Sequence, residues 1–425
     1  MSRTVFLFNK MNYKILTFFL ALIIIVLIIT IVFCVNKMCN CERKGRKCVP
    51  LGKNKKYLNC NSTLNQINGA LNYSDSLFPE TQQQQKELEE VKNKIKSICG
   101  ANKDDTVIFC SSCSEAVATL MHWAAKLNPY GTVIGSDFDH SVAKDNAENY
   151  GLKYEKTLDS PNLNDNAGVI FLTHVNSATG EIMPIDKYLK NLGTYSFLQD
   201  HGYSDEIEGR VLQYRPLVCL DATQSLLKEP INMNNVKDGM LPIDVVVASL
   251  HKIGFDLNFS GVMVISKRVK DSFVPLIAGA QQGKDRGSSV NFEPIIASSY
   301  LLDHFDDRSK RKQKWQESYN YLTGKGLNVY KPKFDHLYST LLIDTNNKCT
   351  LETIEKLSSK HGIYVGNKSA CTNDKYKQNI NGGSVISEGQ KLKPFDNAIR
   401  VSFMDPEALD KSTMDIIAEE LLKLK

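Results

Sequence analysis

The sequence predicts an α/β protein: a doubly wound, mostly parallel sheet forms a large domain, a smaller α+β domain follows, and one transmembrane helix precedes both. Three observations predict this architecture. Apolar β-branched runs alternate with helical segments over residues 106–252 and end in polar residues, as in open α/β sheets. From about residue 300 the pattern changes, and helical segments alternate with short strands, as in an α+β domain. Residues near the N-terminus form one long uncharged run. The expected division is a tail (1–14), a transmembrane helix (15–35), a basic linker (36–56), a large domain (57–300) and a small domain (301–425).

The composition is that of a globular enzyme. The 425 residues are 42% hydrophobic and 23% charged, which leaves room for two domains. The net charge of +5 is small for this length, so no nucleic-acid partner is predicted. Eleven cysteines lack the spacing of a disulfide framework, and most are expected to be free thiols in a reducing compartment. No metal site is predicted, because Cys39, Cys41 and Cys48 lack the partner set that zinc needs.

Residues 15–35 are expected to cross a membrane. They contain no charge, and a helix of this length reaches about 30 Å, the thickness of a bilayer core. The linker that follows is rich in lysine and arginine, with Glu42 as its single acidic residue. By the positive-inside rule the C-terminal side, and with it the folded part of the chain, is predicted to be cytosolic. The same basic run favours anionic lipid headgroups.

The folded part is predicted to begin with a helix and a strand that lead to an anion site. Residues 86–99 place four apolar side chains on one helical face, with Gly100 as the stop. The strand 106–109 then runs into small polar residues that open a helix over 116–127. Unpaired N–H groups and the helix dipole meet at such a turn, so it is suited to a phosphate.

Further strands deliver polar side chains to one edge of the predicted sheet. Strands are expected near 132–134, at 169–172, at 217–220 and at 245–250, and the last two are followed by Asp221 and Lys252. In the smaller domain, helices are expected at 295–304 and 351–361 and a strand at 340–343. The carboxyl ends of parallel strands meet at the edge where such proteins bind their ligands.

An aspartate and a lysine on neighbouring strand ends, a phosphate-binding turn and a ring in a loop between them are what pyridoxal phosphate requires. The lysine forms a Schiff base with the aldehyde, the aspartate keeps the pyridinium nitrogen protonated, and the turn holds the phosphate. His140 supplies the ring. Taken singly, Asp221 has the alternative of capping a helix, and His140 that of a surface histidine.

These residues also carry a family resemblance. Over about residues 57–420 the sequence resembles the cysteine desulfurases of the NifS/IscS type, class V members of the fold-type I pyridoxal-phosphate enzymes. The segments SSCSE at 111–115, DATQ at 221–224 and SLHK at 249–252 resemble the family motifs SGATE, DATQ and SGHK. The resemblance implies cofactor contacts from Ser112, Cys113, Ser114, His140, Ser177, Asp221, Gln224, Ser249, His251 and Lys252. It implies that Lys252 is the Schiff-base lysine.

The C-terminal part of the resemblance implies the reaction. Residues 369–372, SACT, resemble the loop that carries the nucleophilic cysteine, here Cys371, and Arg400 resembles the arginine that holds the substrate carboxylate, with Asn176 as a second substrate contact. L-cysteine would give L-alanine and a persulfide on Cys371, which passes sulfur to an acceptor protein for iron–sulfur clusters or thiolated products. Ser289 stands for a threonine that reaches the phosphate of the partner subunit, which implies a homodimer.

Two departures from the family keep alternatives open. Ser177 stands where the family has an asparagine, and a serine there resembles the class V aminotransferases. Another class V activity, as an aminotransferase or a lyase, is therefore an alternative. The segment 253–261 after the lysine also differs from the family pattern, so an inactive membrane-anchored scaffold is a second alternative.

Overall fold

The chain divides into two units, residues 1–55 and 56–425. The computed structural model describes residues 56–58, 82–158, 167–193, 205–207, 210–212, 216–234, 240–253, 260–288, 292–303, 308–345, 350–367 and 398–423. The predicted span at 15–35 lies outside these residues, as does the basic linker up to Lys55. Within the ranges described, no helix has the length and apolar character that crossing a membrane requires.

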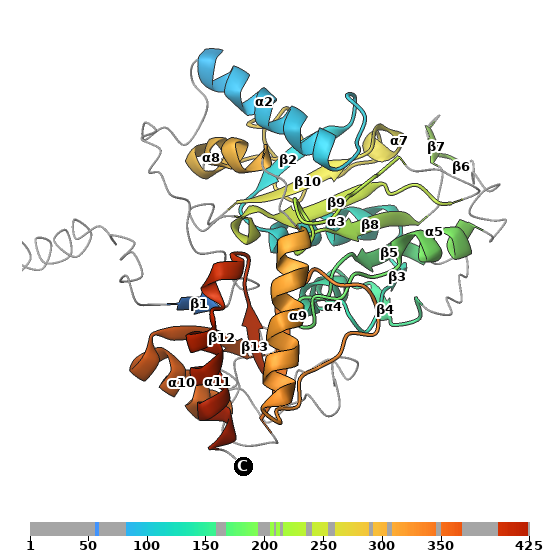
Figure 1. The fold of residues 1–425 in the computed structure, drawn as a ribbon. Coiled ribbons are helices and arrows are strands. Elements are labelled where there is room, and N and C mark those ends of the chain that lie inside the picture. Colours follow the sequence, from blue (N-terminus) through green and yellow to red (C-terminus); the bar gives the residue numbers. More distant parts are fainter. Residues whose placement is uncertain are drawn as a thin grey trace, which may run out of the picture. The chain divides into compact units, whose positions relative to one another are not determined.

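A seven-stranded sheet forms the centre of the larger part of the second unit (Figure 1). Five neighbouring strands pair parallel with one another, and β10 pairs antiparallel with both of its neighbours. The prediction of a mostly parallel sheet is confirmed. In spatial order the strands are β2 (Thr106–Cys110), β10 (Gly261–Ile265), β9 (Val245–Ser249), β8 (Leu217–Asp221), β5 (Ala167–Thr173), β3 (Thr132–Ile134) and β4 (Lys153–Glu155).

Helices cover both faces of this sheet. Successive side chains of a strand point to opposite faces, so they enter two different cores. On β2, Phe109 joins one core and Ile108 the other. The first core is covered by α2 (Gln82–Ile98), α5 (Ile185–Gly193) and α8 (Phe292–Leu302), and the second by α3 (Cys113–Leu127) and α4 (Ser141–Asn149). A sheet buried on both faces explains why its strands are continuous apolar runs in the sequence.

The predicted amphipathic helix at 86–99 is α2. Val91 and Ile95 are fully buried, and Leu88 and Ile98 pack against the same core. The helix ends before Gly100, whose φ of 59° is the left-handed conformation that glycine adopts readily at a helix end.

A four-stranded sheet forms the smaller part, in the order β1 (Lys56–Leu58), β12 (Ile363–Asn367), β13 (Ala398–Ser402) and β11 (Thr340–Asp344). The sequence division placed residues from 57 onward in the large domain, whereas β1 pairs parallel with β12 in this C-terminal sheet. Its core is completed by α9 (Arg308–Gly324), α10 (Thr350–His361) and α11 (Lys411–Leu422). The remaining described elements are β6 (Asp205–Ile207), β7 (Arg210–Leu212), α7 (Lys267–Lys270) and two short 3-10 helices, η1 (Leu250–Lys252) and η7 (Pro406–Ala408).

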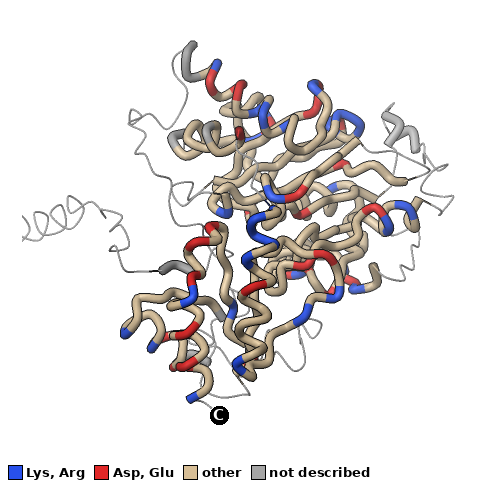
Figure 2. Tube along the Cα trace, viewed as in Figure 1, with Lys and Arg blue, Asp and Glu red and all other residues tan. Residues whose placement is uncertain are grey.

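Basic and acidic residues interleave over most of the described chain (Figure 2). The beginning of α9 is different, because its sequence, RSKRKQK, holds no acidic residue. Arg308 there reaches Glu229 and Asp335, which links α9 to the large part of the unit and to the segment before β11.

Candidate active site

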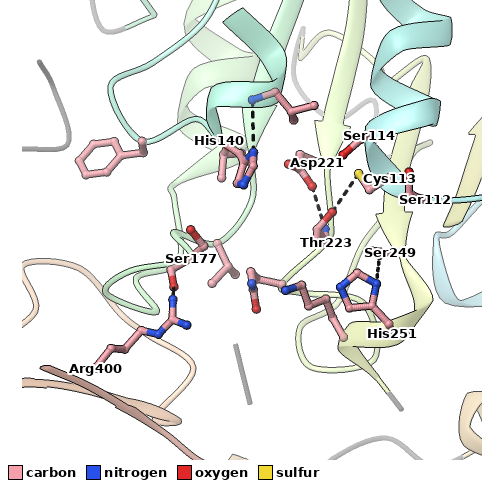
Figure 3. A pocket seen from close by; sticks show the side chains of 16 residues that line it. Ser112, Cys113, Ser114, His140, Ser177, Asp221, Thr223, Ser249, His251 and Arg400 are labelled. Carbon is pink, nitrogen blue, oxygen red and sulfur yellow. Dashed lines mark hydrogen bonds between the residues drawn. The ribbon is translucent and has the colours of Figure 1, made fainter. Parts of the chain in front are cut away.

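One pocket gathers the polar ends of the predicted strands (Figure 3). It lies at the carboxyl ends of β5, β8 and β9, beside the first turn of α3, and β13 of the smaller sheet contributes one side chain. Its lining is Ser112, Cys113, Ser114, Phe138, His140, Val142, Thr173, Val175, Ser177, Asp221, Thr223, Gln224, Ser249, His251, Lys252 and Arg400. The structure therefore brings together every described residue of the predicted site except Asn176.

The first turn of α3 forms one wall of the pocket. The helix begins at Cys113, three residues before the predicted start, because the Ser112 hydroxyl accepts a hydrogen bond from Glu115 N at 3.2 Å and caps it. Cys113 and Ser114 thus belong to the helix, and the unpaired N–H groups of its first turn are those that bind anions.

Glycine at position 261 lets α3 approach the sheet so closely. A Cβ atom on Gly261 would lie 2.3 Å from the carbonyl carbon of Ser112 and 2.8 Å from Cys113 N. Glu115 and Arg286 fix the same turn from its other side, with Arg286 Nε 2.5 Å from Glu115 Oε1 and Ser111 N donating to Glu115 Oε2 at 2.8 Å. The turn predicted to bind an anion is therefore shaped by backbone contacts as well as by side chains.

The end of β8 places a carboxylate next to this wall. Asp221 Oδ1 accepts a hydrogen bond from Thr223 N at 2.9 Å, and the Thr223 hydroxyl donates to Cys113 Sγ at 3.1 Å. Burial raises the pKa of the Cys113 thiol well above its ordinary value, and the negative charge of Asp221 adds to the rise. The Cys113 thiol is thus uncharged where it lines the pocket, and it is not a thiolate nucleophile.

The end of β9 delivers Ser249, His251 and Lys252. The turn η1 directs Leu250 into the core, while His251 and Lys252 line the pocket. Ser249 Oγ lies 2.6 Å from His251 Nδ1. Burial and the neighbouring Lys252 charge lower the pKa of His251 to about 4, so this imidazole is neutral near pH 7.

The opposite wall carries His140, Ser177 and Arg400. His140 caps α4, with its Nδ1 accepting a hydrogen bond from Val142 N at 3.2 Å. Arg400 is 1% exposed, and its Nη1 donates to the carbonyl oxygen of Ser177 at 3.0 Å. The guanidinium therefore enters the pocket from the smaller sheet.

Asn176 lies next to the pocket and has a different part in the structure. Its Oδ1 accepts hydrogen bonds from Ala178 N at 2.8 Å and from Thr179 N at 3.0 Å. The side chain is 4% exposed and holds the turn that carries Ser177. Asn176 was predicted to contact substrate, but it is not one of the residues that line the pocket. Side chains after β5 alternate between two sides of the chain, and that of Asn176 is on the side away from the pocket.

That alternation also explains pocket residues that sequence reasoning missed. Thr173 and Val175, which were not predicted, line the pocket together with the predicted Ser177, whereas His174 and Asn176 between them do not. The period of two that continues from a strand was the available signal. Ser289 and Cys371 lie outside the described residues.

The pocket fits the cofactor predicted from the sequence. A helix N-terminus held against a strand by Gly261 suits a phosphate, Asp221 suits a pyridinium nitrogen, and the Lys252 amine suits an aldehyde.

Comparison with known proteins supports this fold. Residues 60–198 match the family described as Aminotransferase class-V. No curated protein sequence matches the chain. Class V aminotransferases and cysteine desulfurases depend on pyridoxal phosphate, the cofactor predicted here.

Solved structures share the fold at low sequence identity. A NifS-like protein from Rickettsia africae is 16% identical with a TM-score of 0.63, over 87% of this chain and 99% of that chain. A cysteine desulfurase from Thermococcus onnurineus is 16% identical with a TM-score of 0.63, over 88% of this chain and 96% of that chain. SspA, solved in complex with cysteine, is 18% identical with a TM-score of 0.61, over 82% of this chain and 99% of that chain.

Proposed function

We propose that the chain is a pyridoxal-phosphate-dependent cysteine desulfurase, which converts L-cysteine to L-alanine and leaves the sulfur as a persulfide on Cys371. One observation carries the proposal: Asp221 at the end of β8, Lys252 in the turn after β9 and Arg400 within β13 line one pocket beside the first turn of α3. The shared fold with cysteine desulfurases and with a cysteine-bound protein supports the choice of substrate.

The residues that would hold the cofactor lie on both sides of the pocket. The first turn of α3, with Ser249 and His251, would bind the phosphate. Asp221 would pair with the ring nitrogen, Gln224 would pair with the ring hydroxyl, and Ser177 would be a further cofactor contact. The bound cofactor supplies an aldehyde for the substrate amine and a ring that accepts the electron pair from Cα.

The remaining steps belong to side chains of this chain. Arg400 binds the substrate carboxylate through charge-assisted hydrogen bonds, which burial strengthens. The Lys252 amine takes the proton from Cα as general base. The Cβ–S bond of the substrate breaks, an S–S bond to Cys371 forms, and the carbon skeleton leaves as alanine with the protons released from Cα and the Cys371 thiol.

The remaining parts of the proposal concern partners. An acceptor protein receives the sulfur from Cys371. Two copies of the chain form a homodimer in which Ser289 of one reaches the phosphate in the other. The sequence resemblance supports both statements.

Two substitutions test the reaction. In Lys252→Ala the visible absorbance of the bound cofactor is lost together with cysteine turnover. In Cys371→Ser the absorbance remains while alanine and sulfide formation from cysteine is abolished. Lys267→Ala, at a side chain that is 72% exposed, is the matched control and leaves both unchanged. Full cysteine turnover in Cys371→Ser would refute the proposal.

A second class V reaction, that of an aminotransferase or a lyase, is favoured by Ser177 in the pocket and by the match at residues 60–198. An aminotransferase of this class would form alanine from pyruvate and an amino donor. That activity would be the same in Cys371→Ser as in the unmodified chain, which separates the two functions.

A further inference from the structure

A buried polar cluster lies behind the wall of the pocket that carries His140. Asp139, the residue before it, is 4% exposed, and its carboxylate accepts four hydrogen bonds. Oδ2 accepts from Ser136 N at 2.8 Å and from Tyr154 Oη at 2.7 Å. Oδ1 accepts from Ser136 Oγ at 2.9 Å and from Thr173 Oγ1 at 2.6 Å. We call Ser136, Asp139, Tyr154 and Thr173 the Asp139 cluster.

The Asp139 cluster joins separate parts of the sheet. Ser136 follows β3, Tyr154 lies on the edge strand β4, and Thr173 ends β5. Two donors on each oxygen use the acceptor positions of an ionised carboxylate. Burial raises the pKa of the Asp139 carboxyl, and the four donated hydrogen bonds oppose that rise.

The spacing within the cluster is fixed by a glycine. A Cβ atom on Gly135 would lie 2.3 Å from Tyr154 Oη and 2.5 Å from Asp139 Oδ2. A side chain at position 135 would therefore overlap with both of these groups, so the close approach of the cluster to the backbone requires glycine here. The backbone that leads to His140 is therefore held by a close contact as well as by hydrogen bonds.

The hydrogen bond from Val142 N also decides where the proton of His140 resides. A backbone N–H donates, so Nδ1 of His140 is its acceptor and carries no proton. The neutral ring then has its proton on Nε2. Thr173, which also lines the pocket, gives its one hydroxyl proton to Asp139 and offers the pocket no donor.

We propose that Asp139 is a positioning residue, which Tyr154 clamps from the edge strand. The pair holds His140 at the cap of α4, with its ring in the pocket and its proton on Nε2. A flat aromatic ligand would meet this ring face in a single orientation. That last consequence rests on the proposed function, whereas the positioning itself does not.

Hydrogen exchange measured by mass spectrometry on the full-length protein without cofactor tests the positioning. In Tyr154→Phe, amide exchange in peptides that cover 136–143 becomes about tenfold faster, because a hydrogen bond to a charged group is lost. The exchange of the His140 ring C2 proton becomes faster as well. Peptides from α3 keep their exchange rates, which distinguishes a local loosening from a general loss of stability.

Three further variants complete the test. His140→Asn retains a good helix cap without the ring, so amide exchange at 140–143 stays slow. Tyr150→Phe removes a nearby hydroxyl outside the cluster and changes neither rate. Asp139→Asn can still accept from Ser136 N and Tyr154 while its amide donates to the two other hydroxyls, so it retains slow exchange where Asp139→Ala loses it.

The positioning role is overturned if folded Tyr154→Phe protein shows the unmodified rates at 136–143 and at the His140 ring. It is equally overturned if α3 loosens as much as 136–143. These measurements need no cofactor and no substrate. A chain that fails to turn over cysteine would therefore refute the proposed function and leave this inference standing.

Discussion

His174 shows how one residue position separates a pocket residue from a core residue. It follows Thr173 and precedes Val175, both of which line the pocket, but its own side chain is 8% exposed and lies outside the lining. Its Nδ1 makes no hydrogen bond within the described part of the chain. Burial lowers the pKa of this imidazole to about 4, from an ordinary value of 6.5. The folded protein therefore holds it neutral.

His174 is expected to make stability fall in acid. As the pH drops from 6.5 toward 4, the unfolded chain binds a proton at this residue before the folded chain does. The contribution to the free energy of unfolding is fully present above pH 6.5 and is lost toward pH 4, by about 3 kcal/mol. Urea unfolding of His174→Leu and of the unmodified protein at several pH values measures it. If the unfolding free energy changed with pH by the same amount in both proteins, His174 would not be the cause of the loss of stability in acid.

The residues of the candidate site that sequence reasoning placed well are those at strand ends. Asp221 and Lys252 each follow an apolar run, and the geometry of a parallel sheet then brings them to one edge. Asn176 was assigned to substrate from the family resemblance, but its side chain caps a turn. The sequence alone does not show which of two adjacent polar residues faces a pocket. It does so only if the alternation of side-chain directions along the strand is assumed to continue into the loop.

At the scale of elements, the contact between β10 and the start of α3 shapes the anion site. The sequence predicted this helix to begin at Ala116, because the polar residues before it have the composition of a turn. The structure begins it at Cys113, where Ser112 provides the cap. Gly261, more than a hundred residues later in the chain, makes room for that cap. Such a long-range contact has no local signal.

Gly261→Ala is expected to disturb this contact. The added methyl group would stand 2.3 Å from the Ser112 carbonyl carbon, so the strand or the helix must shift, at a cost of about 1 to 3 kcal/mol in unfolding free energy. Cofactor affinity should fall with it, because the N–H groups of α3 move. Chemical denaturation and a cofactor titration measure the two effects.

Gly324→Ala is the matched control for that substitution. Nothing lies within 4 Å of a Cβ atom at this position, and no left-handed φ is recorded there. Alanine at the end of α9 should leave stability unchanged or raise it by about 0.5 to 1 kcal/mol. A similar loss in both variants would show that steric contact at Gly261 is not the cause.

At the scale of the whole molecule, the pocket needs both sheets. Arg400 on β13 reaches Ser177, which is 223 positions away in the sequence. Both sheets were expected from the alternation of strands and helices, and the mostly parallel order of the larger one is confirmed. Their contact through a buried guanidinium was implied only by resemblance, because no periodicity links residues at such a separation.

The sequence-based expectation for residues 15–35 is a membrane anchor with the catalytic part in the cytosol, and we retain it as a proposal. The full chain should sediment with membranes and resist alkaline extraction, whereas a chain that begins near Asn54 should not. The sequons at Asn61, Asn72, Asn258 and Asn367 should then carry no glycan, because a cytosolic domain never meets the transferase. Glycosylation at any of these asparagines would show that the C-terminal part lies on the other side of the membrane, opposite to the predicted orientation.

The pairing of β1 with β12 has a consequence for biosynthesis. The earliest strand of the described chain has as its neighbour residues 363–365, so a ribosome must deliver nearly the entire polypeptide before Lys56–Leu58 find their place. Contacts of such wide separation form late and slowly. Until translation is almost complete, Lys56–Leu58 have no partner strand. The folded structure that forms earlier in the nascent protein therefore depends on the larger sheet alone.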